Sequence, residues 1–416
     1  MMTAAMGAAQ TPERMQWFTD ARFGMFLHWG VYSAAGGEWK GATNHAEWLQ
    51  FTAKIPIAEY AEFAAGFNPV KFNADDWARM AKDAGMRYIV ITAKHHDGFA
   101  MYDSKADPYS VVAATRYKHD PLQDLAAACR KYGLKFCVYY SLGRDWHDPD
   151  VPTRDGWRSN LVDFPDESKK DFTKYYERKV KPQVRELLTD YGPIGIMWFD
   201  TPEKIGKAQS EELVRMIHEL QPQCIVNQRV GNKLGDYGTP EQKIPGEIGA
   251  APWETCMTMN RHWGYNSHDH DWKSPEVLVR NLIDIVSKGG NYLLNIGPTG
   301  EGLFPPEAVA RLSAIGAWMK VNGEAIYASG ATPFGAELKG REWRATTKPG
   351  RLYVHVFEWP AGRLQLPAMK GRIAKAYLLE GNKPVMFEQS TEGVSVTLPK
   401  QPVDPIATVV CFELRS

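Results

Sequence analysis

The chain has 416 residues, of which 44% are hydrophobic and 24% charged, and its formal net charge is zero. This composition is typical of a globular protein with a large core, and the length fits a barrel with a small additional domain. A zero net charge argues against a nucleic acid or a membrane surface as partner, since both attract basic proteins.

The first residues, Met1 to Gln10, lack the basic start and long apolar stretch of a signal peptide. The sequence contains no stretch of about 18 apolar residues, so we expect no membrane span. The default expectation is therefore a cytoplasmic location, or a periplasmic or secreted one if a signal has been removed. The five cysteines match no zinc-binding spacing, and no disulfide framework is needed. Cys137 and Cys224 lie inside apolar runs, so we expect them to be buried and reduced.

Short apolar runs alternate with amphipathic segments up to about residue 335. The apolar runs predict strands at Gly24–His28, Tyr88–Ala93, Leu134–Ser141, Ile194–Asp200, Cys224–Asn227 and Tyr292–Gly297. The amphipathic segments predict helices at Ala74–Ala84, Pro121–Lys131, Lys169–Thr189, Ser210–Glu219 and Pro275–Ser287. Strands that are apolar throughout are covered on both faces, so this alternation predicts a parallel sheet between helices. The number of units favours an α/β fold of the (β/α)8-like TIM barrel type, regular or irregular, and no GxGxxG motif supports a dinucleotide fold.

From residue 336 the pattern changes to short segments rich in β-branched residues, separated by Gly, Pro and Asn. The predicted strands here are Arg351–Glu358, Ile373–Leu379, Val394–Leu398 and Ala407–Leu414. Such spacing is typical of an antiparallel β-sandwich. We therefore expect a barrel domain over residues 1–335 and a C-terminal β-sandwich domain over residues 336–416.

Polar or aromatic side chains stand where each predicted strand of the barrel ends. Active sites of parallel barrels lie at the C-terminal ends of the strands, so these side chains are expected to share one rim. A chance scatter of polar residues would not line up in this way. The residues concerned are His28, Trp29, Lys94, His95, His96, Asp97, Tyr139, Tyr140, Ser141, Arg144, Asp145, Trp146, His147, Asp148, Trp198, Asp200, Asn227, Gln228, Arg229, Trp253 and Glu254.

Asp200 is the carboxylate that ends the apolar run beginning at Ile194. It could cap a helix, because Thr201 and Pro202 follow it in a way that allows a helix to begin there. The alternative is a catalytic carboxylate. Glycosidases need two carboxyls: retaining enzymes use one as nucleophile and the other as acid/base, and the two lie about 5–5.5 Å apart.

Two glutamates are candidates for the second carboxyl. Glu241 lies in a loop after the fifth predicted strand, where it could swing over a bound sugar. Glu254 follows Trp253, and burial beside this side chain would raise its pKa, which also suits a general acid. Chemistry alone does not choose between them.

The adjacent pair His95–His96 could suggest a metal site. Neighbouring side chains on a strand point to opposite faces, so the pair is a poor two-ligand set, and one of them can pack into the wall. No His-x-x-x-His or Cys-x-x-Cys spacing supports a metal. We expect no metal and no cofactor, and imidazoles that bind hydroxyl groups instead.

At these residues the chain resembles glycoside hydrolase family 29, the α-L-fucosidases. The similarity spans about residues 15–330 in the family order. The matching segments are Trp17–Ser33, Ala46–Trp48, Lys94–Phe99, Tyr139–Ser141, Trp198–Asp200, Asn227–Arg229, Thr239–Glu241, Trp253–Cys256 and Lys288–Pro298.

The resemblance implies an exo-acting glycoside hydrolase that removes terminal α-L-fucosyl residues from a fucosylated oligosaccharide or glycoconjugate. It implies retention through a covalent fucosyl-enzyme, with Asp200 as nucleophile. The acid/base of different members falls at the position of Glu241 or of Glu254, and the separation from Asp200 favours Glu241. Positions that contact fucose carry over to His28, Glu47, Trp48, His95, His96, Tyr140, Trp198 and Arg229.

Three features complicate this match. Phe199 and Thr201 flank Asp200 where many members have Asn and Gly or Met, and Glu38–Trp39 is a second Glu-Trp pair close to Glu47–Trp48. Two rival hypotheses are a sugar-binding protein without activity and a metal-dependent hydrolase on the same barrel. The sequence does not predict the linkage that is cleaved or the oligomeric state.

Overall fold

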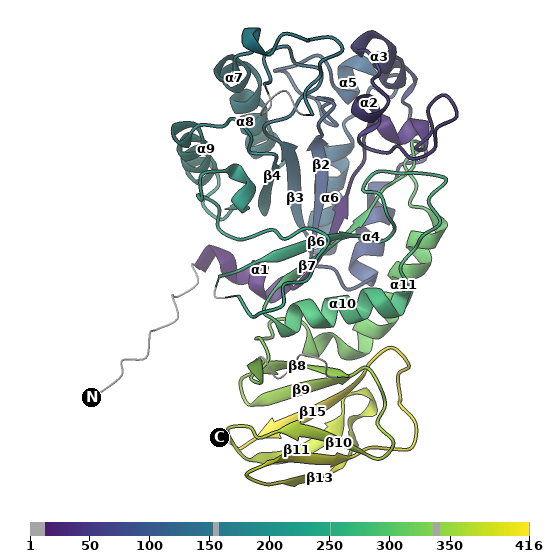
Figure 1. Cartoon of the computed structure of the whole chain (residues 1–416), viewed down its shortest axis with the longest axis vertical. Helices are drawn as coiled ribbons and strands as arrows, with labels where there is room; N and C mark the ends of the chain where they lie inside the picture. Colours follow the sequence, from purple (N-terminus) through teal and green to yellow (C-terminus); the bar gives the residue numbers. More distant parts are fainter. Residues whose placement is uncertain (1–12, 153–157, 250, 336–341, 416) are drawn as a thin grey trace, which may run out of the picture.

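A computed structural model of the protein describes residues 13–152, 158–249, 251–335 and 342–415. A curled parallel sheet surrounded by helices forms the N-terminal part, and antiparallel sheets form a smaller unit at its base (Figure 1). The predicted boundary at residue 336 falls in a segment outside the described residues.

Seven parallel strands form the central sheet, in the order β5-β4-β3-β2-β1-β7-β6. Every residue of these strands is buried except Lys135 and the partly buried Asp200, because helices cover the outer face and aromatic side chains fill the inside. The strands are β1 Phe23–Leu27, β2 Tyr88–Lys94, β3 Lys135–Ser141, β4 Ile196–Asp200, β5 Ile225–Val226, β6 Glu254–Thr258 and β7 Asn291–Ile296.

Local capping fixes the ends of several helices. The side chain of Asn73 accepts a hydrogen bond from Asp76 N at the start of α4, and Asp120 does the same for Leu122 N at the start of α6. The predicted helix 169–189 is divided by a π-helical turn over Tyr176–Val180. The helices are α1 Gln16–Ala21, α2 Leu49–Thr52, α3 Ile57–Gly66, α4 Ala74–Asp83, α5 Val111–Ala114, α6 Pro121–Tyr132, α7 Phe172–Tyr175, α8 Lys181–Asp190, α9 Lys207–Leu220, α10 Pro275–Ser287 and α11 Pro306–Asn322.

The expected eight-stranded barrel is found only in part. Strands β5 and β6 are the two edges of the sheet, and the segment over residues 236–242 crosses the gap between them. This segment makes isolated parallel bridges, Tyr237 with Asn227 and Glu241 with Cys256. Pro240 has no N–H to donate, so a regular ladder cannot form along it. The irregular segment carries Glu241 to the C-terminal end of the sheet.

The C-terminal part contains a five-stranded antiparallel sheet, β12-β11-β15-β9-β8, and a three-stranded one, β10-β14-β13. Apolar residues of both sheets share one core, which agrees with the predicted sandwich arrangement. The strands are β8 Trp343–Lys348, β9 Arg351–Val356, β10 Arg363–Pro367, β11 Ile373–Leu378, β12 Lys383–Pro384, β13 Met386–Gln389, β14 Gly393–Thr397 and β15 Thr408–Leu414.

Helices α10 and α11 join the two parts. Trp318 donates to the carbonyl oxygen of Ala407 at 3.0 Å, and Arg280 donates to that of Phe357 at 2.7 Å.

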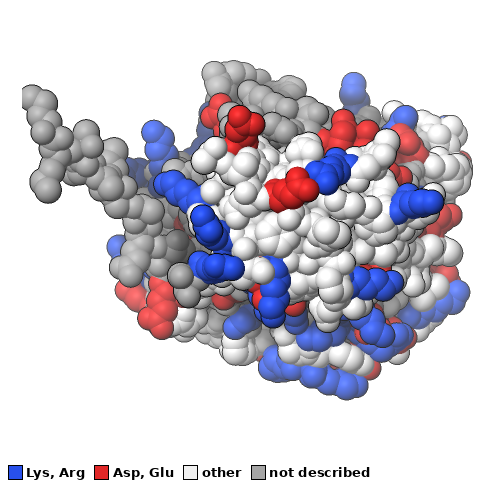
Figure 2. Space-filling view, turned by 90° about the horizontal axis from the view of Figure 1, so that it is seen from below, with Lys and Arg blue, Asp and Glu red and all other residues white. Residues whose placement is uncertain are grey.

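Figure 2 views the molecule from below, onto the end that the C-terminal part forms in Figure 1. On this face, basic and acidic side chains lie mostly around the rim of a largely uncharged area.

The five cysteines are free and buried, which confirms the predicted burial of Cys137 and Cys224. Within the described ranges, none of the helices combines the length and apolar character that a membrane span requires.

Candidate active site

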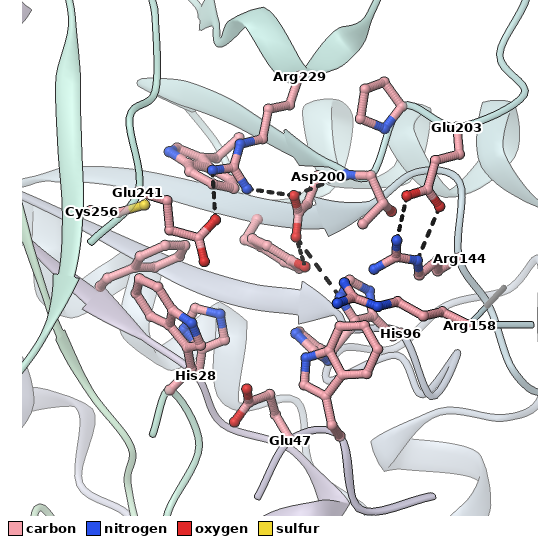
Figure 3. Close-up of a pocket in the computed structure, with 18 residues that line it drawn as sticks. His28, Glu47, His96, Arg144, Arg158, Asp200, Glu203, Arg229, Glu241 and Cys256 are labelled. Atoms are coloured by element: carbon pink, nitrogen blue, oxygen red, sulfur yellow. Dashed lines mark hydrogen bonds and ion pairs between the residues drawn. The ribbon is translucent and has the colours of Figure 1, made fainter. Parts of the chain in front are cut away.

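A pocket of about 350 Å³ opens at the C-terminal ends of the parallel strands. Carboxylates, guanidinium groups, imidazoles and aromatic rings all converge on it (Figure 3). Its lining residues are Phe26, His28, Glu47, Trp48, His95, His96, Tyr139, Arg144, Arg158, Trp198, Asp200, Thr201, Pro202, Glu203, Arg229, Glu241, Cys256 and Trp263.

Asp200 ends β4 and reaches into this pocket with its side chain 16% exposed. Its Oδ1 accepts from Arg229 Nη1 at 2.7 Å, and its Oδ2 accepts from the hydroxyl of Tyr139 at 2.8 Å. No helix begins at Asp200, because the next one, α9, starts at Lys207. The alternative that Asp200 is a helix cap is therefore wrong, and the carboxylate is held in one orientation at the pocket floor.

The charge of Asp200 is stabilised by its neighbours. Burial alone would raise the pKa of this carboxyl, but the guanidinium of Arg229 and the hydrogen bonds from Arg229 and Tyr139 outweigh burial and lower it. At neutral pH the group is an oriented carboxylate with its negative charge retained.

Glu241 stands across the pocket from Asp200 and is bound to the same guanidinium (Figure 3). Arg229 Nη2 donates to Glu241 Oε2 at 2.9 Å, and Arg229 itself is fixed by Thr239, whose hydroxyl accepts from Nε at 3.1 Å. The side chain of Glu241 is 44% exposed, so it can move toward a ligand. The structure thus brings Asp200 and Glu241, one of its two predicted partners, together in one pocket.

Glu254, the other candidate, does not line the pocket. Its side chain is completely buried below Trp198, whose indole Nε1 donates to Oε1 at 2.9 Å. The hydroxyl groups of Tyr88 and Tyr237 also donate to this carboxyl, at 2.6 and 3.4 Å. Burial raises the pKa of Glu254 to about 7 despite these hydrogen bonds. The raised pKa suits an acid, but the position suits a residue that holds Trp198.

Both members of the His95–His96 pair face the pocket, which corrects the expectation that their side chains point to opposite faces. Strand β2 ends at Lys94, and its pairing with β3 shifts register between Thr92 and Lys94. Alternation between faces applies only within a regular strand. The two rings lie 4.0 Å apart between centroids. The described part of the chain holds no group of three or more side chains suited to a metal ion.

His28 is a neutral imidazole with a defined proton position. Asn295 donates its amide N–H to the carbonyl of Trp263 at 2.7 Å, so its Oδ1 is left to accept from His28 Nδ1, also at 2.7 Å. Burial lowers the pKa of His28 to about 4. Its Nε2 is therefore an acceptor for a hydroxyl group.

His96 is arranged in the same way. Ser141 donates to the carbonyl oxygen of Arg144 at 2.9 Å, which leaves its Oγ to accept from His96 Nδ1 at 2.7 Å. His96 Nε2 lies 3.9 Å from Asp200 Oδ2. Burial lowers the pKa of both His95 and His96 well below the ordinary value. Nδ1 of His95 has no hydrogen-bond partner among the described residues, so the walls of this pocket hold unused hydrogen-bonding capacity.

The pair Glu47–Trp48 lines the pocket, whereas Glu38–Trp39 does not. Glu47 is buried, which raises its pKa, and it accepts from Gly264 N at 2.7 Å. Trp39 instead packs against Phe63 outside the pocket. Of the two pairs, Glu47–Trp48 is therefore the one that lies where it can contact a ligand in this pocket.

Tyr140 does not reach the pocket, so its prediction as a sugar-contacting residue is wrong. Its buried hydroxyl donates to Gln183 Oε1 at 2.8 Å, on the outer side of the sheet. Alternation along β3 instead directs Tyr139 inward, where it binds Asp200. The next strand, β4, alternates in the same way: Trp198 and Asp200 line the pocket, and Phe199 is buried outside it. Thr201 follows the end of β4 with a φ of +52°, which breaks the alternation, and it lines the pocket as well.

Sequence reasoning missed several lining residues, among them Trp263 and Arg158. Trp263 lies 5.1 Å from His28 between ring centroids, and Arg158 lies over the ring of Trp48, 4.8 Å from its centroid. Both come from loops without a periodic pattern. Arg144, expected at the rim because it follows the end of a strand, lines the pocket and forms a two-point ion pair with Glu203.

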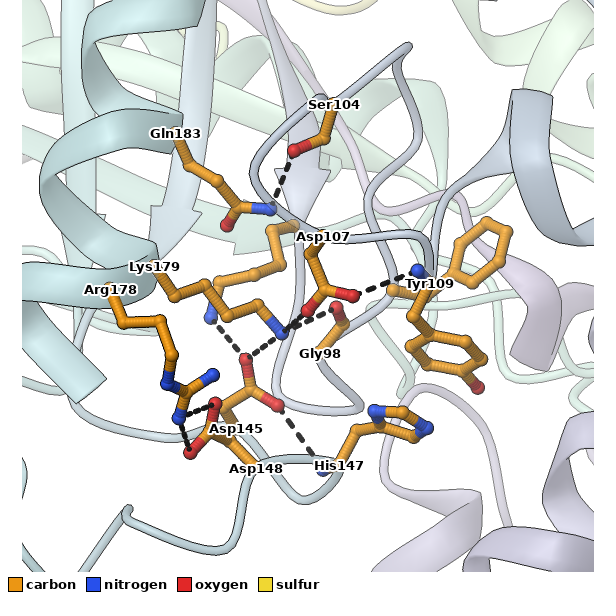
Figure 4. A network of polar contacts seen from close by, with 12 residues as sticks. Gly98, Ser104, Asp107, Tyr109, Asp145, His147, Asp148, Arg178, Lys179 and Gln183 are labelled. Carbon is orange, nitrogen blue, oxygen red and sulfur yellow. Dashed lines mark hydrogen bonds and ion pairs between the residues drawn. The ribbon is translucent and has the colours of Figure 1, made fainter. Parts of the chain in front are cut away.

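A buried ion cluster behind the pocket holds the loop after β3 (Figure 4). Asp145 is fully buried and accepts from Lys179 at 2.7 Å and from Lys94 at 3.2 Å. Burial alone would raise the pKa of Asp145, but these two ammonium groups lower it. The loop also places Trp146, whose N–H donates to the carbonyl oxygen of His96 at 2.7 Å.

The chain is similar in sequence and in structure to known α-L-fucosidases. A family profile described as Alpha-L-fucosidase matches residues 3–324. Tissue α-L-fucosidase of Rattus norvegicus is 30% identical over 415 residues, covering 93% of this chain and 86% of the relative. α-L-Fucosidase isoenzyme 1 from Paenibacillus thiaminolyticus is 36% identical, with a TM-score of 0.89 over 97% of this chain and 99% of its own. An α-L-fucosidase from Vibrio sp. strain EJY3 is 34% identical, with a TM-score of 0.91 over 97% of this chain and 73% of its own.

Proposed function

The chain belongs to the α-L-fucosidase family and is a glycoside hydrolase, and from this premise we propose that it removes terminal α-L-fucosyl residues with retention of configuration. The proposed substrate is a fucosylated oligosaccharide or glycoconjugate. One observation supports the assignment above the others: the Asp200 carboxylate is oriented by Tyr139 and Arg229 at the floor of the pocket.

In the proposed first step, a carboxylate oxygen of Asp200 attacks the anomeric carbon. The bond to the leaving oxygen breaks, and a covalent fucosyl-enzyme forms. The lowered pKa of Asp200 supports this role, because the nucleophile must be ionised. Arg229 and Tyr139 occupy fixed positions before the reaction, so little reorganisation is needed.

Glu241 is the proposed acid/base. Its exposed carboxyl gives a proton to the leaving oxygen and then takes one from the water that cleaves the fucosyl-enzyme. In the structure the carboxyl of Glu241 accepts a hydrogen bond from Arg229 at 2.9 Å. The proposed step therefore includes a movement of Glu241 away from Arg229 toward the leaving group, which its 44% exposure permits.

Fucose is proposed to lie between the imidazoles and the aromatic rings of the pocket. Neutral His28 and His96 each offer an acceptor nitrogen to a sugar hydroxyl, and Glu47 offers a carboxyl oxygen. The rings of Trp198 and Trp263 provide apolar surface for the methyl group and the C–H faces of the sugar.

The test uses Asp200→Gly with an aryl α-L-fucoside as substrate. This variant should lose nearly all hydrolysis, and added azide should restore turnover with β-L-fucosyl azide as product, because azide attacks from the side that the carboxylate has left. Asp200→Asn, which keeps the size of the side chain, should be equally inactive. Full activity in Asp200→Asn would contradict the assignment.

A further inference from the structure

A second cavity, of about 530 Å³, lies next to the proposed fucose pocket. Its wall is mostly apolar, and it is formed by α2 with the turn that follows, by Trp146, and by residues 158–162. Two adjacent aliphatic side chains, Leu161 and Val162, stand at its rim with 46% and 47% of their surface exposed. Neighbouring exposed aliphatic groups at a concave site indicate a place where an apolar ligand is covered.

Hydrogen bonds fix the walls of this cavity. The indole Nε1 of Trp146 donates to the carbonyl oxygen of Arg158 at 3.0 Å, and the amide of Asn160 donates to the carbonyl oxygen of Trp146 at 2.7 Å. Asn160 also donates to Asp163 at 2.9 Å, and Asp163 accepts from Ile57 N at 3.0 Å. The apolar surface is therefore held open by a polar framework.

A continuous aromatic wall connects this cavity to Asp200. His96 lies 3.9 Å from the carboxylate, and its ring centroid is 5.1 Å from that of Trp48. Trp48 contacts Trp146 at 5.3 Å, and Trp146 stacks on Phe51 at 5.7 Å with an angle of 20° between the rings. Arg158 lines both cavities. The wall therefore runs from the proposed nucleophile to the second cavity without a break.

We propose that this cavity, lined by Phe51, Ile55, Trp146, Leu161 and Val162, binds an apolar alkyl or aryl aglycone of the fucoside. The inference rests on the proposed function, because it takes the first pocket to hold fucose. Lys54 and Arg158 are the charged residues of the lining, but most of its surface comes from aromatic and aliphatic side chains. It therefore favours an aliphatic or aromatic group over a heavily hydroxylated one, since each buried hydroxyl would need a partner. The cavity thus selects among fucosides by the group that leaves.

The test measures binding of two uncleaved ligands to the whole protein by calorimetry, methyl and hexyl 1-thio-α-L-fucopyranoside. Each buried methylene adds favourable free energy, so the hexyl compound should bind at least tenfold more tightly. In Leu161→Ser/Val162→Ser this preference should fall below threefold, with the affinity for the methyl compound unchanged. Leu303→Ser alters a side chain of similar exposure, 42%, that lines neither cavity, and it should keep the full preference.

Equal affinities for the two compounds in the natural protein would overturn the inference, as would a preference that survives in the double variant. A tighter fit for a second sugar in place of the hexyl group would also overturn it. Release of nitrophenol from an aryl α-L-fucoside tests the proposed function separately. Hydrolysis without any alkyl preference would refute the second site alone, whereas no hydrolysis of any fucoside would refute the function.

Discussion

Arg229 Nη1 donates to Asp200 Oδ1 across 2.7 Å, while Nη2 of the same guanidinium binds Glu241 at 2.9 Å. One guanidinium group therefore binds both carboxylates of the proposed mechanism. It is itself held by Thr239, on the irregular segment that crosses the gap between β5 and β6. A change at Arg229 consequently reaches the proposed nucleophile and the proposed acid/base together.

Replacing Arg229 with methionine should move the acidic limb of the pH profile to higher pH. Asp200 must be ionised to attack, and without the guanidinium its burial is no longer offset, so its pKa rises and activity is lost earlier as pH falls. kcat/KM for an aryl fucoside should also drop at least tenfold, because a charge-assisted hydrogen bond is lost. Arg229→Lys keeps the positive charge, so its acidic limb should stay near that of the natural enzyme. An unmoved limb in Arg229→Met would contradict this account.

Adjacent tyrosines on β3 offer a matched pair. Tyr139→Phe removes the donor to Asp200 Oδ2 and should lower kcat/KM by about 10- to 100-fold, since hydrogen bonds to charged groups contribute about 1.5–3 kcal/mol. Tyr140→Phe removes the hydroxyl that binds Gln183 and Tyr175 outside the pocket, so it should change kcat/KM less than twofold while destabilising the fold by about 1 kcal/mol. Kinetics and urea unfolding on both variants check this. The reverse ranking in kcat/KM would mean that Tyr140, not Tyr139, acts in the site.

The regular parts of the fold were predictable because burial leaves a clear pattern. The apolar run Tyr88–Ala93 became β2, and the capped segment after Asn73 became α4. The closing segment over residues 236–242 was not predictable as a strand, since Gly238 and Pro240 leave no periodicity. Helix α11 was missed as well.

The site was predictable where side chains directly follow a strand. Asp200, His28 and Arg229 were placed correctly in one pocket by that rule. Tyr140 failed because the choice between neighbours depends on strand register, which a single residue's identity does not reveal. Trp263 and Arg158 were missed because they approach from distant loops, and only tertiary packing brings them to the pocket.

The roles of Glu241 and Glu254 separate through the leaving group. Glu241→Ala should slow fucosides with poor leaving groups by about 10²–10⁴-fold, because protonation is then needed, and should slow fucosides of acidic phenols much less. Glu254→Gln should lower the rate for both kinds of fucoside by a similar factor, since the carboxyl acts by holding Trp198. Steady-state kinetics with a series of aryl fucosides measures this dependence. A strong dependence in Glu254→Gln and none in Glu241→Ala would exchange the assignments.

Glu254 should also make stability depend on pH. Its pKa rises on folding from 4.5 to about 7, so between these values the folded state holds a proton that the unfolded state has lost. The free energy of unfolding therefore falls by an amount on the order of 3 kcal/mol as pH rises through this window. Above the window the contribution of Glu254 no longer changes with pH. Urea unfolding at pH 5 and pH 7.5 should show this fall, and Glu254→Gln should reduce it. An identical fall in the variant would show that other groups cause it.

Gly98, the glycine of the loop that follows β2, should be difficult to replace. A Cβ at this position would lie 2.0 Å from Oδ1 of Asp145, and its φ of +76° already disfavours other residues. Gly98→Ala must therefore displace Asp145 from Lys94 and Lys179, and disturbing a buried ion pair costs about 3–5 kcal/mol.

Gly133→Ala is the matched control for this substitution. Gly133 ends α6 with a φ of +67°, and nothing lies within 4 Å of its added Cβ. It carries the backbone penalty alone, about 1 kcal/mol. Thermal and urea unfolding should rank Gly98→Ala well below Gly133→Ala. Asp145 directly precedes Trp146, which lines the second cavity. Gly98→Ala should therefore also reduce the preference for the hexyl over the methyl thiofucoside, whereas Gly133→Ala should leave that preference intact. Equal stability of the two variants would mean that the buried cluster tolerates the displacement of Asp145.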